Sequence, residues 1–251
     1  MLALISSDVL KLRRRRGMLA ISLLLTAGLM AVAFVVMAIQ HGGNPADYGP
    51  AGGLANYQED IAVASLMALI IGTIIGATAG SQDLESGVFR DLAATGRSRM
   101  ALFASRVAGA WAVVLPILAV TAGLVAAGCV ALAGSLAAPG AGAIVAGTAA
   151  VLVAGTLSTA VAVGVSALVG SRGPVIGIML AFYLAVQNLV LAMGVLGGAR
   201  QILPDVAIRR IGELEPLSDV HVGLGAAILV VIAWSTLTLG LGAWRTRTRE
   251  I

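Results

Sequence analysis

The chain has 251 residues, of which 59% are hydrophobic and 11% are charged, with a formal net charge of +4. About 25% of the residues in a soluble domain are charged, so this composition excludes an ordinary soluble protein. Several apolar stretches exceed the roughly 18 to 20 residues that cross a bilayer as a helix, without the short alternating segments of a membrane β-barrel. The sequence predicts an all-α, polytopic membrane protein.

Six apolar stretches, taken in chain order, predict six transmembrane helices within a single transmembrane domain that covers residues 1–251. They span residues 17–39, 61–79, 107–134, 143–169, 175–197 and 222–244. None of these stretches contains Lys, Arg, Asp or Glu. The third and fourth are longer than a bilayer requires, so we expect them to tilt or to project from it.

The basic residues are distributed unequally between the two sides of this topology. Thirteen of the 16 Lys and Arg residues fall on the side of the two termini, whereas the other side holds only Arg200, Arg209 and Arg210, together with seven acidic residues. Cytoplasmic segments retain positive charge. The sequence therefore predicts a multi-pass membrane protein with both termini in the cytoplasm.

Residues 1–16 precede the first apolar stretch and carry a helical pattern of their own. Leu2, Ile5, Val9 and Leu12 recur at helical spacing, which predicts an amphipathic helix lying along the inner membrane surface. The alternative is a disordered tail in which the spacing arises by chance. The basic run at 13–16 is expected to contact lipid headgroups rather than nucleic acid.

The second apolar stretch ends in GTIIGATAG, in which Gly72, Gly76 and Gly80 recur every fourth residue. Small residues at this spacing let a neighbouring helix approach closely. We expect these glycines to serve close helix packing, and dimerisation is the weaker alternative.

The segment 80–106 separates the second and third apolar stretches and begins GSQDLESGVFRDLAATGRSR. Asp83 and Glu85 stand at its start, and Arg97 and Arg99 at its end, which is the favourable arrangement for a helix dipole. Its apolar positions Leu84, Val88 and Leu92 form a stripe, Arg90 and Asp91 project elsewhere, and Gly96 is a plausible stop. The pattern predicts a short cytoplasmic helix with one apolar face. It is either a contact site for a partner or an ordinary solvated loop helix.

Several chemistries are missing from the sequence. There is no G-x-x-x-x-G-K-[ST] motif, and the only lysine is Lys11, so this chain cannot build a Walker-type nucleotide site. There is no H-E-x-x-H motif, and the two histidines, His41 and His221, flank different stretches. We expect no catalytic and no metal-binding residues. The lack of ionisable residues in the apolar stretches also speaks against a proton-coupled carrier, although a Na⁺ site built from carbonyls and hydroxyls stays open.

Four segments, in this order, resemble the membrane-spanning permeases of ABC type-2 exporters. SSDVLKLRRRRG resembles the amphipathic entry helix of that family, and GSQDLESGVFRDLAATGRSRMALFASR resembles its coupling-helix segment. QILPDVAIRRIGE, within residues 198–221, resembles the extracellular re-entrant region, and GAWRTRTREI resembles the closing tail. The chain departs from the family pattern at Val88, where Thr is frequent, and at Gly96, where Pro is frequent.

The resemblance implies a permease of the bacterial plasma (inner) membrane that is driven by a separate nucleotide-binding ATPase. That partner would be present in two copies and would bind the ATP and Mg, so the chain itself needs no cofactor. A second permease copy, identical or homologous, would complete the usual twelve spans. The coupling role would fall on Asp83, Glu85, Gly87, Arg90, Asp91, Ser98 and Arg99.

The cargo is expected to be a hydrophobic or amphiphilic compound, such as a drug, an antibiotic or a lipid, because the stretches consist mostly of Ala, Val, Leu and Gly. Gln187 and Asn188 are candidate pathway residues, with interhelical hydrogen bonding as the alternative. Two rival functions remain at this point. One is a secondary transporter that works alone, and the other is a non-transporting membrane scaffold or immunity protein.

Overall fold

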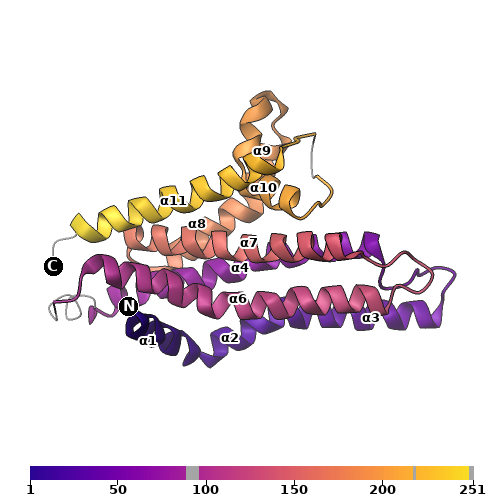
Figure 1. The fold of residues 1–251 in the computed structure, drawn as a ribbon, viewed down its shortest axis with the longest axis horizontal. Helices are drawn as coiled ribbons and strands as arrows, with labels where there is room; N and C mark the ends of the chain where they lie inside the picture. The colour runs from indigo at the N-terminus through magenta and orange to yellow at the C-terminus, as the bar shows by residue number, and fades with distance from the viewer. Residues whose placement is uncertain (89–95, 217–218, 249–251) are drawn as a thin grey trace.

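The computed structural model describes residues 1–88, 96–216 and 219–248, which form the helical molecule in Figure 1. Six helical segments of these residues are long and apolar enough to cross a membrane: Arg16–Gly43, Leu54–Glu85, Arg99–Ala131, Ala141–Val169, Arg172–Ala192 and Leu224–Thr248. The predicted all-helical, multi-pass architecture is thereby confirmed. All six coincide with the six apolar stretches of the sequence.

Four of these segments are single α-helices, and two contain a π-helical turn. The single helices are α4 (Leu54–Glu85), α6 (Arg99–Ala131), α7 (Ala141–Val169) and α11 (Leu224–Thr248). The first span consists of α2 (Arg16–Leu23), a π turn at Leu24–Gly28 and α3 (Leu29–Gly43). The fifth consists of α8 (Arg172–Ala181), a π turn at Phe182–Val186 and α9 (Gln187–Ala192). Short helices are α1 (Leu2–Arg13), a 3-10 segment at Gly194–Ile202 and α10 (Pro204–Ile211).

Two of the helices extend well past the apolar stretches that predict them. The second stretch, 61–79, is too short at both ends, because α4 runs from Leu54 to Glu85. The third begins too late, because α6 starts at Arg99. Apolar length locates the part of a helix that suits lipid, whereas the helix itself continues until its backbone is capped. As a result, Asp60, Asp83 and Arg106 lie within helices that the sequence predicts to be free of charge.

The centre of the molecule is the contact between α4 and α7, where the three predicted glycines lie. A Cβ atom on Gly76 would come within 2.6 Å of the Thr159 carbonyl oxygen, and one on Gly72 or Gly80 would meet Ser158 or Ser166 of α7. The absence of side chains lets the two backbones approach closely. Within the single chain, this face of α4 is therefore occupied by α7.

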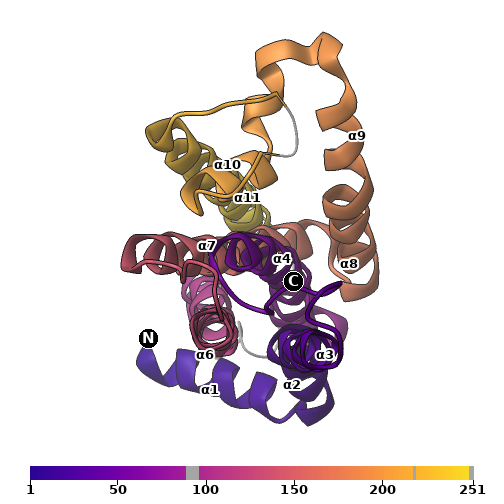
Figure 2. The same ribbon diagram turned by 90° about the vertical axis from the view of Figure 1, so that its right-hand side faces the viewer.

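Helices α3, α4, α6 and α7 run along the long axis of the molecule, as Figure 1 shows. Figure 2 looks along that axis and shows α1 extended across the end of the bundle, with α2 leading back from it. Helices α9 and α10 lie beside the bundle rather than in it. We call the end where α4 finishes and α6 begins the Asp83 end. In Figure 1, α10 lies above the bundle, between the Asp83 end and the opposite end, and we call the region around it the α10 end.

The α10 end is covered by the chain between α9 and α11. Val206, Ala207 and Ile208 of α10 are buried, and α10 packs on α11 and α7. Trp234 of α11 donates its indole N–H to the Ile202 carbonyl at 2.8 Å. These contacts hold residues 202–208, which belong to the region 198–221 predicted from the resemblance as re-entrant.

Candidate functional site

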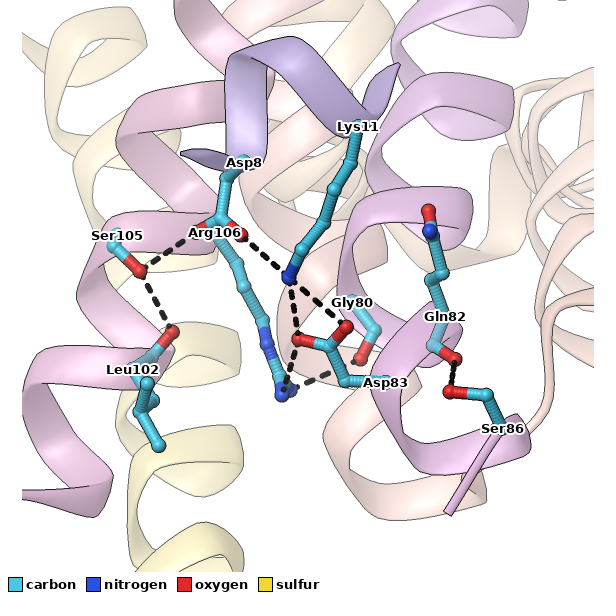
Figure 3. A network of polar contacts seen from close by, with 9 residues as sticks. All are labelled: Asp8, Lys11, Gly80, Gln82, Asp83, Ser86, Leu102, Ser105 and Arg106. Carbon is cyan, nitrogen blue, oxygen red and sulfur yellow. Dashed lines mark hydrogen bonds and ion pairs between the residues drawn. The ribbon is translucent and has the colours of Figure 1, made fainter. Parts of the chain in front are cut away.

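Charged and polar side chains from three helices meet at the Asp83 end (Figure 3). Asp8 and Lys11 come from α1, Asp83 from the last turn of α4, and Ser105 and Arg106 from the second turn of α6. We call these five residues the α1–α4–α6 network. Three of them, Asp83, Ser105 and Arg106, fall inside the predicted coupling segment 80–106, at the two helix ends that the segment includes.

Asp83 is the centre of the network because its carboxylate is shared by two cations. The Lys11 ammonium lies 3.1 Å from one carboxylate oxygen, and the Arg106 guanidinium lies 3.2 Å from the other. Arg106 also donates to the Gly80 carbonyl, one turn earlier on α4, at 3.3 Å. A single carboxylate therefore links α1 to both α4 and α6.

A second set of contacts fixes α1 against α6. Ser105 donates its hydroxyl to Asp8 at 2.7 Å, and Lys11 lies 3.2 Å from the same carboxylate. The two helices approach closely here, since a Cβ atom on Gly109 would come within 2.9 Å of the Asp8 Cβ. Leu12 is buried beside these polar groups. Helix α1 is therefore docked by both ionic and apolar contacts.

Burial makes these ion pairs interdependent. The Arg106 side chain is 3% exposed and that of Asp83 is 9% exposed, whereas Lys11 keeps 32% of its side chain accessible. A buried charge is tolerated only when it is paired and hydrogen-bonded, and removing one partner strands the other. Displacement of α4 relative to α6 therefore carries a large electrostatic penalty.

Caps delimit the segment between α4 and α6 on both sides. Gly87 follows the last turn of α4 in the left-handed conformation, with φ of 74°, and Gly96 adopts φ of 79°. Such glycines commonly end helices. On the other side, Ser98 caps α6 by accepting the Ala101 backbone N–H at 3.0 Å. Both ends of the segment are thus defined by local backbone chemistry.

Two further contacts connect the same region to the last two spans. The Glu85 carboxylate accepts the backbone N–H of Arg172 at the start of α8. Arg99 donates to the Arg247 carbonyl near the end of α11 at 3.2 Å. The residues around the predicted coupling segment therefore contact α1, α4, α6, α8 and α11.

The predicted coupling residues are brought together only in part. Asp83 and Glu85 end α4 instead of beginning a separate helix, so the expected favourable dipole does not apply to them: acidic groups at a helix C-terminus face the negative end. Val88 is exposed. Arg90, Asp91 and Leu92 lie outside the described residues. Ser98 is a helix cap, and Arg99 contacts α11.

Sequence reasoning missed four members of the network, namely Asp8, Lys11, Ser105 and Arg106. A signal was available for two of them. Lys11 is the only lysine of the chain, and Arg106 stands one residue before the third apolar stretch. Neither position reveals its partner, because Asp83 lies 72 positions from Lys11 and 23 positions from Arg106 in the sequence.

The candidate pathway residues lie near the α10 end and differ from one another. Gln187 is 2% exposed, and its side-chain oxygen accepts the Asp205 backbone N–H at 3.1 Å, which joins α9 to α10. Asn188 is exposed and donates to the Leu184 carbonyl of its own span at 2.9 Å. Both line a cavity of about 190 Å³ between α4 and the fifth span.

At this end, an ion pair also stabilises the loop before α11. Arg200 is buried and reaches both carboxylate oxygens of Asp219, at 3.0 and 3.1 Å, and donates to the Leu191 carbonyl as well. These hydrogen bonds hold the pKa of Asp219 below its usual range. The pairing joins Arg200 of the 3-10 segment to Asp219, which lies shortly before α11.

Across residues 1–88, 96–216 and 219–248, no three or more His, Cys, Asp and Glu side chains gather into a group that would hold a metal ion. The charged and polar groups of the α1–α4–α6 network bind one another, so the network connects three helices mechanically. A scan against protein-family models finds no match to the chain, and a search of the curated proteins finds none either.

Proposed function

We propose that the chain is the membrane-spanning subunit of an exporter driven by a separate ATPase. The observation that carries this proposal is the α1–α4–α6 network, in which Asp83 joins Lys11 and Arg106 beside the segment that would meet the ATPase. The order of the entry helix, the polar segment and the six spans supports it further. The ATPase would bind ATP and Mg, and two permease copies would form the path.

In this proposal, the segment 86–98 is the contact site and the network transmits its movement. A partner that grips the segment displaces the ends of α4 and α6. Because buried charges resist separation, the two helices and α1 move as one unit. Glu85 and Arg99 extend the connection to α8 and α11. ATP-driven movement outside the bilayer thereby reaches the helices that line the cavity at Gln187.

The orientation and location proposed are those that the charge distribution favours. The Asp83 end faces the cytoplasm of a bacterial cell, the α10 end faces outward, and α1 lies at the inner surface. Its position across the bundle in Figure 2 suits an interfacial helix. The cargo proposed is a hydrophobic or amphiphilic compound.

The test is capture of the partner from native membranes in mild detergent, followed by mass spectrometry. Val88→Asp introduces a charge at an exposed position of the proposed contact segment, and Val195→Asp is the matched control at an exposed valine beyond α9. We expect a Walker-motif ATPase to accompany the wild-type chain and Val195→Asp, and to be lost with Val88→Asp. Recovery of the chain without an ATPase in all three samples contradicts the proposal.

The structure also provides an observation that favours the rival secondary transporter. Asp60 lies within α4 and is partly buried, with its carboxylate 3.4 Å from the Cys129 thiol that donates to it. An acidic residue inside a span is the usual site of ion coupling. Purified chain reconstituted without an ATPase distinguishes the two functions: flux that depends on an ion gradient, and is lost in Asp60→Asn, favours the rival. A captured ATPase with no translocated compound favours the scaffold.

A further inference from the structure

Two cavities lie one above the other along α4 and meet at a single arginine. The inner cavity, of about 190 Å³, is lined by Ala62, Val63, Leu66 and Leu69 of α4. The outer cavity, of about 260 Å³, is lined by Ala55, Gln58, Glu59 and Ala62. Ala62 and Arg209 line both of them. Together they form a groove that follows three to four turns of α4 toward the α10 end.

The inner half of the groove is apolar with one polar group at its wall. Leu66, Leu69, Tyr183 and Leu184 supply its surface. Gln187 is 2% exposed, and its side-chain oxygen accepts the Asp205 backbone N–H. Among the described residues, its amide nitrogen has no hydrogen-bond partner but is not one of the fully enclosed polar atoms, so it is accessible and can donate to an acceptor on a bound molecule. The half-open side at Val63 and Leu184, both exposed, admits a molecule from the surrounding lipid.

The outer half of the groove is acidic. Glu59 and Glu215 line it, and in the part of the chain that the structure describes neither carboxylate forms an ion pair. Arg209 does not neutralise them, because its guanidinium is paired with Asp205 at 2.9 Å and donates to the Glu215 backbone carbonyl. The four charged groups of the groove therefore leave two negative charges at its outer end.

The size of the cavities indicates that one ligand must use both. Pockets that hold drug-sized molecules measure roughly 300 to 1,000 Å³ and are mostly apolar with a few placed polar groups. Neither half reaches that size alone, and the two halves adjoin at Ala62 and Arg209, which line both. A molecule that fills the groove has an apolar body inside, an acceptor oxygen near Gln187 and its head at the outer carboxylates.

We propose that the groove between α4, α9 and α10 binds a single amphiphilic cation, with its apolar body against Leu66 and Leu69 and its positive group at Glu59 and Glu215. That the cation is the exported cargo rests on the proposed function; the binding itself does not. Arg209 lines both halves, and its pairing with Asp205, one turn earlier on α10, engages the only guanidinium among the described residues that line the groove.

The experiment is a fluorescence-polarisation titration of the purified chain in an uncharged detergent, with no ATPase or nucleotide present. Rhodamine 6G is a cationic xanthene ester, and fluorescein ethyl ester is its anionic counterpart. We expect the cationic dye to bind and the anionic dye not to compete. Glu59→Gln and Glu215→Gln should each weaken cation binding up to roughly fivefold, and the double variant up to roughly thirtyfold, since each exposed charge pair contributes up to about 1 kcal/mol.

Two controls separate the groove from general effects. Asp47→Asn removes a carboxylate from the loop after α3, which lines neither half of the groove, and should leave binding unchanged. Ala62→Phe places a ring at the junction and should abolish binding while the protein elutes and melts like wild type. Cation binding that is unchanged both in Ala62→Phe and in the double glutamate variant overturns the proposal. A changed oligomeric state of Ala62→Phe with unchanged dye binding also overturns it, because a second copy of the chain then fills the groove.

This outcome is independent of the ATPase capture experiment. Dye binding without a captured ATPase contradicts the proposed exporter function and supports the proposed binding groove. A captured ATPase without dye binding contradicts the binding groove and supports the exporter function.

Discussion

At the scale of single residues, the Asp83 carboxylate forms ion pairs with two cations from different helices. Lys11 is one-third exposed and keeps access to water, whereas Arg106 is nearly fully buried. The two partners therefore depend on Asp83 to different degrees. Loss of the carboxylate leaves Arg106 as a buried charge without its counter-ion, whereas loss of Lys11 leaves the Asp83–Arg106 pair intact.

We predict that Asp83→Asn lowers the free energy of unfolding by about 3 kcal/mol, the low end of the cost of breaking a buried ion pair. Lys11→Gln should cost about 1 kcal/mol or less, because exposed pairs contribute little. Denaturant unfolding in mixed micelles measures both. Equal losses in the two variants would contradict the central position of Asp83.

A second prediction concerns Asp219, whose pKa is lowered by the hydrogen bonds from Arg200. A carboxylate with a depressed folded pKa stabilises the fold above its unfolded pKa, and this contribution is lost as pH falls through the folded value. The loop should therefore stay closed at neutral pH and open only below the ordinary aspartate pKa of about 3.9.

Trp234 reports on that opening, because its indole donates to Ile202 in the same loop. With Trp111 and Trp244 replaced by Phe, the emission of Trp234 should shift to the red in acid. Asp219→Asn should show the shifted emission already at neutral pH. An emission maximum of Asp219→Asn that matches the parent at neutral pH would refute the role of the pair.

At the scale of elements, the helices themselves follow from the sequence and their ends do not. Continuous apolar stretches predict all six spans. The ends depend on backbone caps such as Ser98 and Gly87, and on the contact of Asp83 with Arg106, which stabilises a charged last turn of α4. Hydropathy carries no information on either cause. It therefore predicts a second stretch that is shorter than α4, and it leaves Asp83 and Glu85 outside that helix.

The contact of α4 with α7 gives a prediction at this scale. Gly76→Ala would place a Cβ atom 2.6 Å from the Thr159 carbonyl, which is backbone and cannot rotate away. Overpacking of this kind costs about 1–3 kcal/mol. Gly123→Ala is the matched control, because a Cβ atom there meets nothing within 4 Å. A lower melting temperature for Gly76→Ala alone is expected, and equal melting would show that α4 and α7 separate more easily than their spacing implies.

At the scale of the whole molecule, the sequence predicts only part of the candidate site that the structure shows. The acidic start and the capping serine of the polar segment stand out in the sequence, because charge between two apolar stretches is conspicuous. Their partners Asp8, Lys11 and Arg106 do not, since nothing local marks a contact between α1 and α6. The groove with Glu59 and Glu215 cannot be predicted from the sequence either, because residues of α4 and α10 line it together only in the folded chain.

The orientation of the molecule gives the last prediction. Cysteines introduced at Ser86 and at Asp47 lie at opposite ends, and the native Cys129 is fully buried, which keeps background labelling low. In intact cells an impermeant maleimide should label Asp47→Cys, and it should label Ser86→Cys only after permeabilisation. The reverse pattern would invert the proposed topology and remove the polar segment from the reach of a cytoplasmic ATPase.

The position of α1 across the bundle has a consequence for the order in which the protein is built. Asp8 binds Ser105, 97 positions further along the chain. At a synthesis rate of about 5–20 residues per second, that partner emerges on the order of 5–20 s later. Until Asp83 and Ser105 have been synthesised, the only ionic partner of Asp8 and of Lys11 within this network is the other residue of the pair. Helix α1 thus reaches its final place only after α6 has been synthesised, and a chain truncated before α6 should leave it undocked.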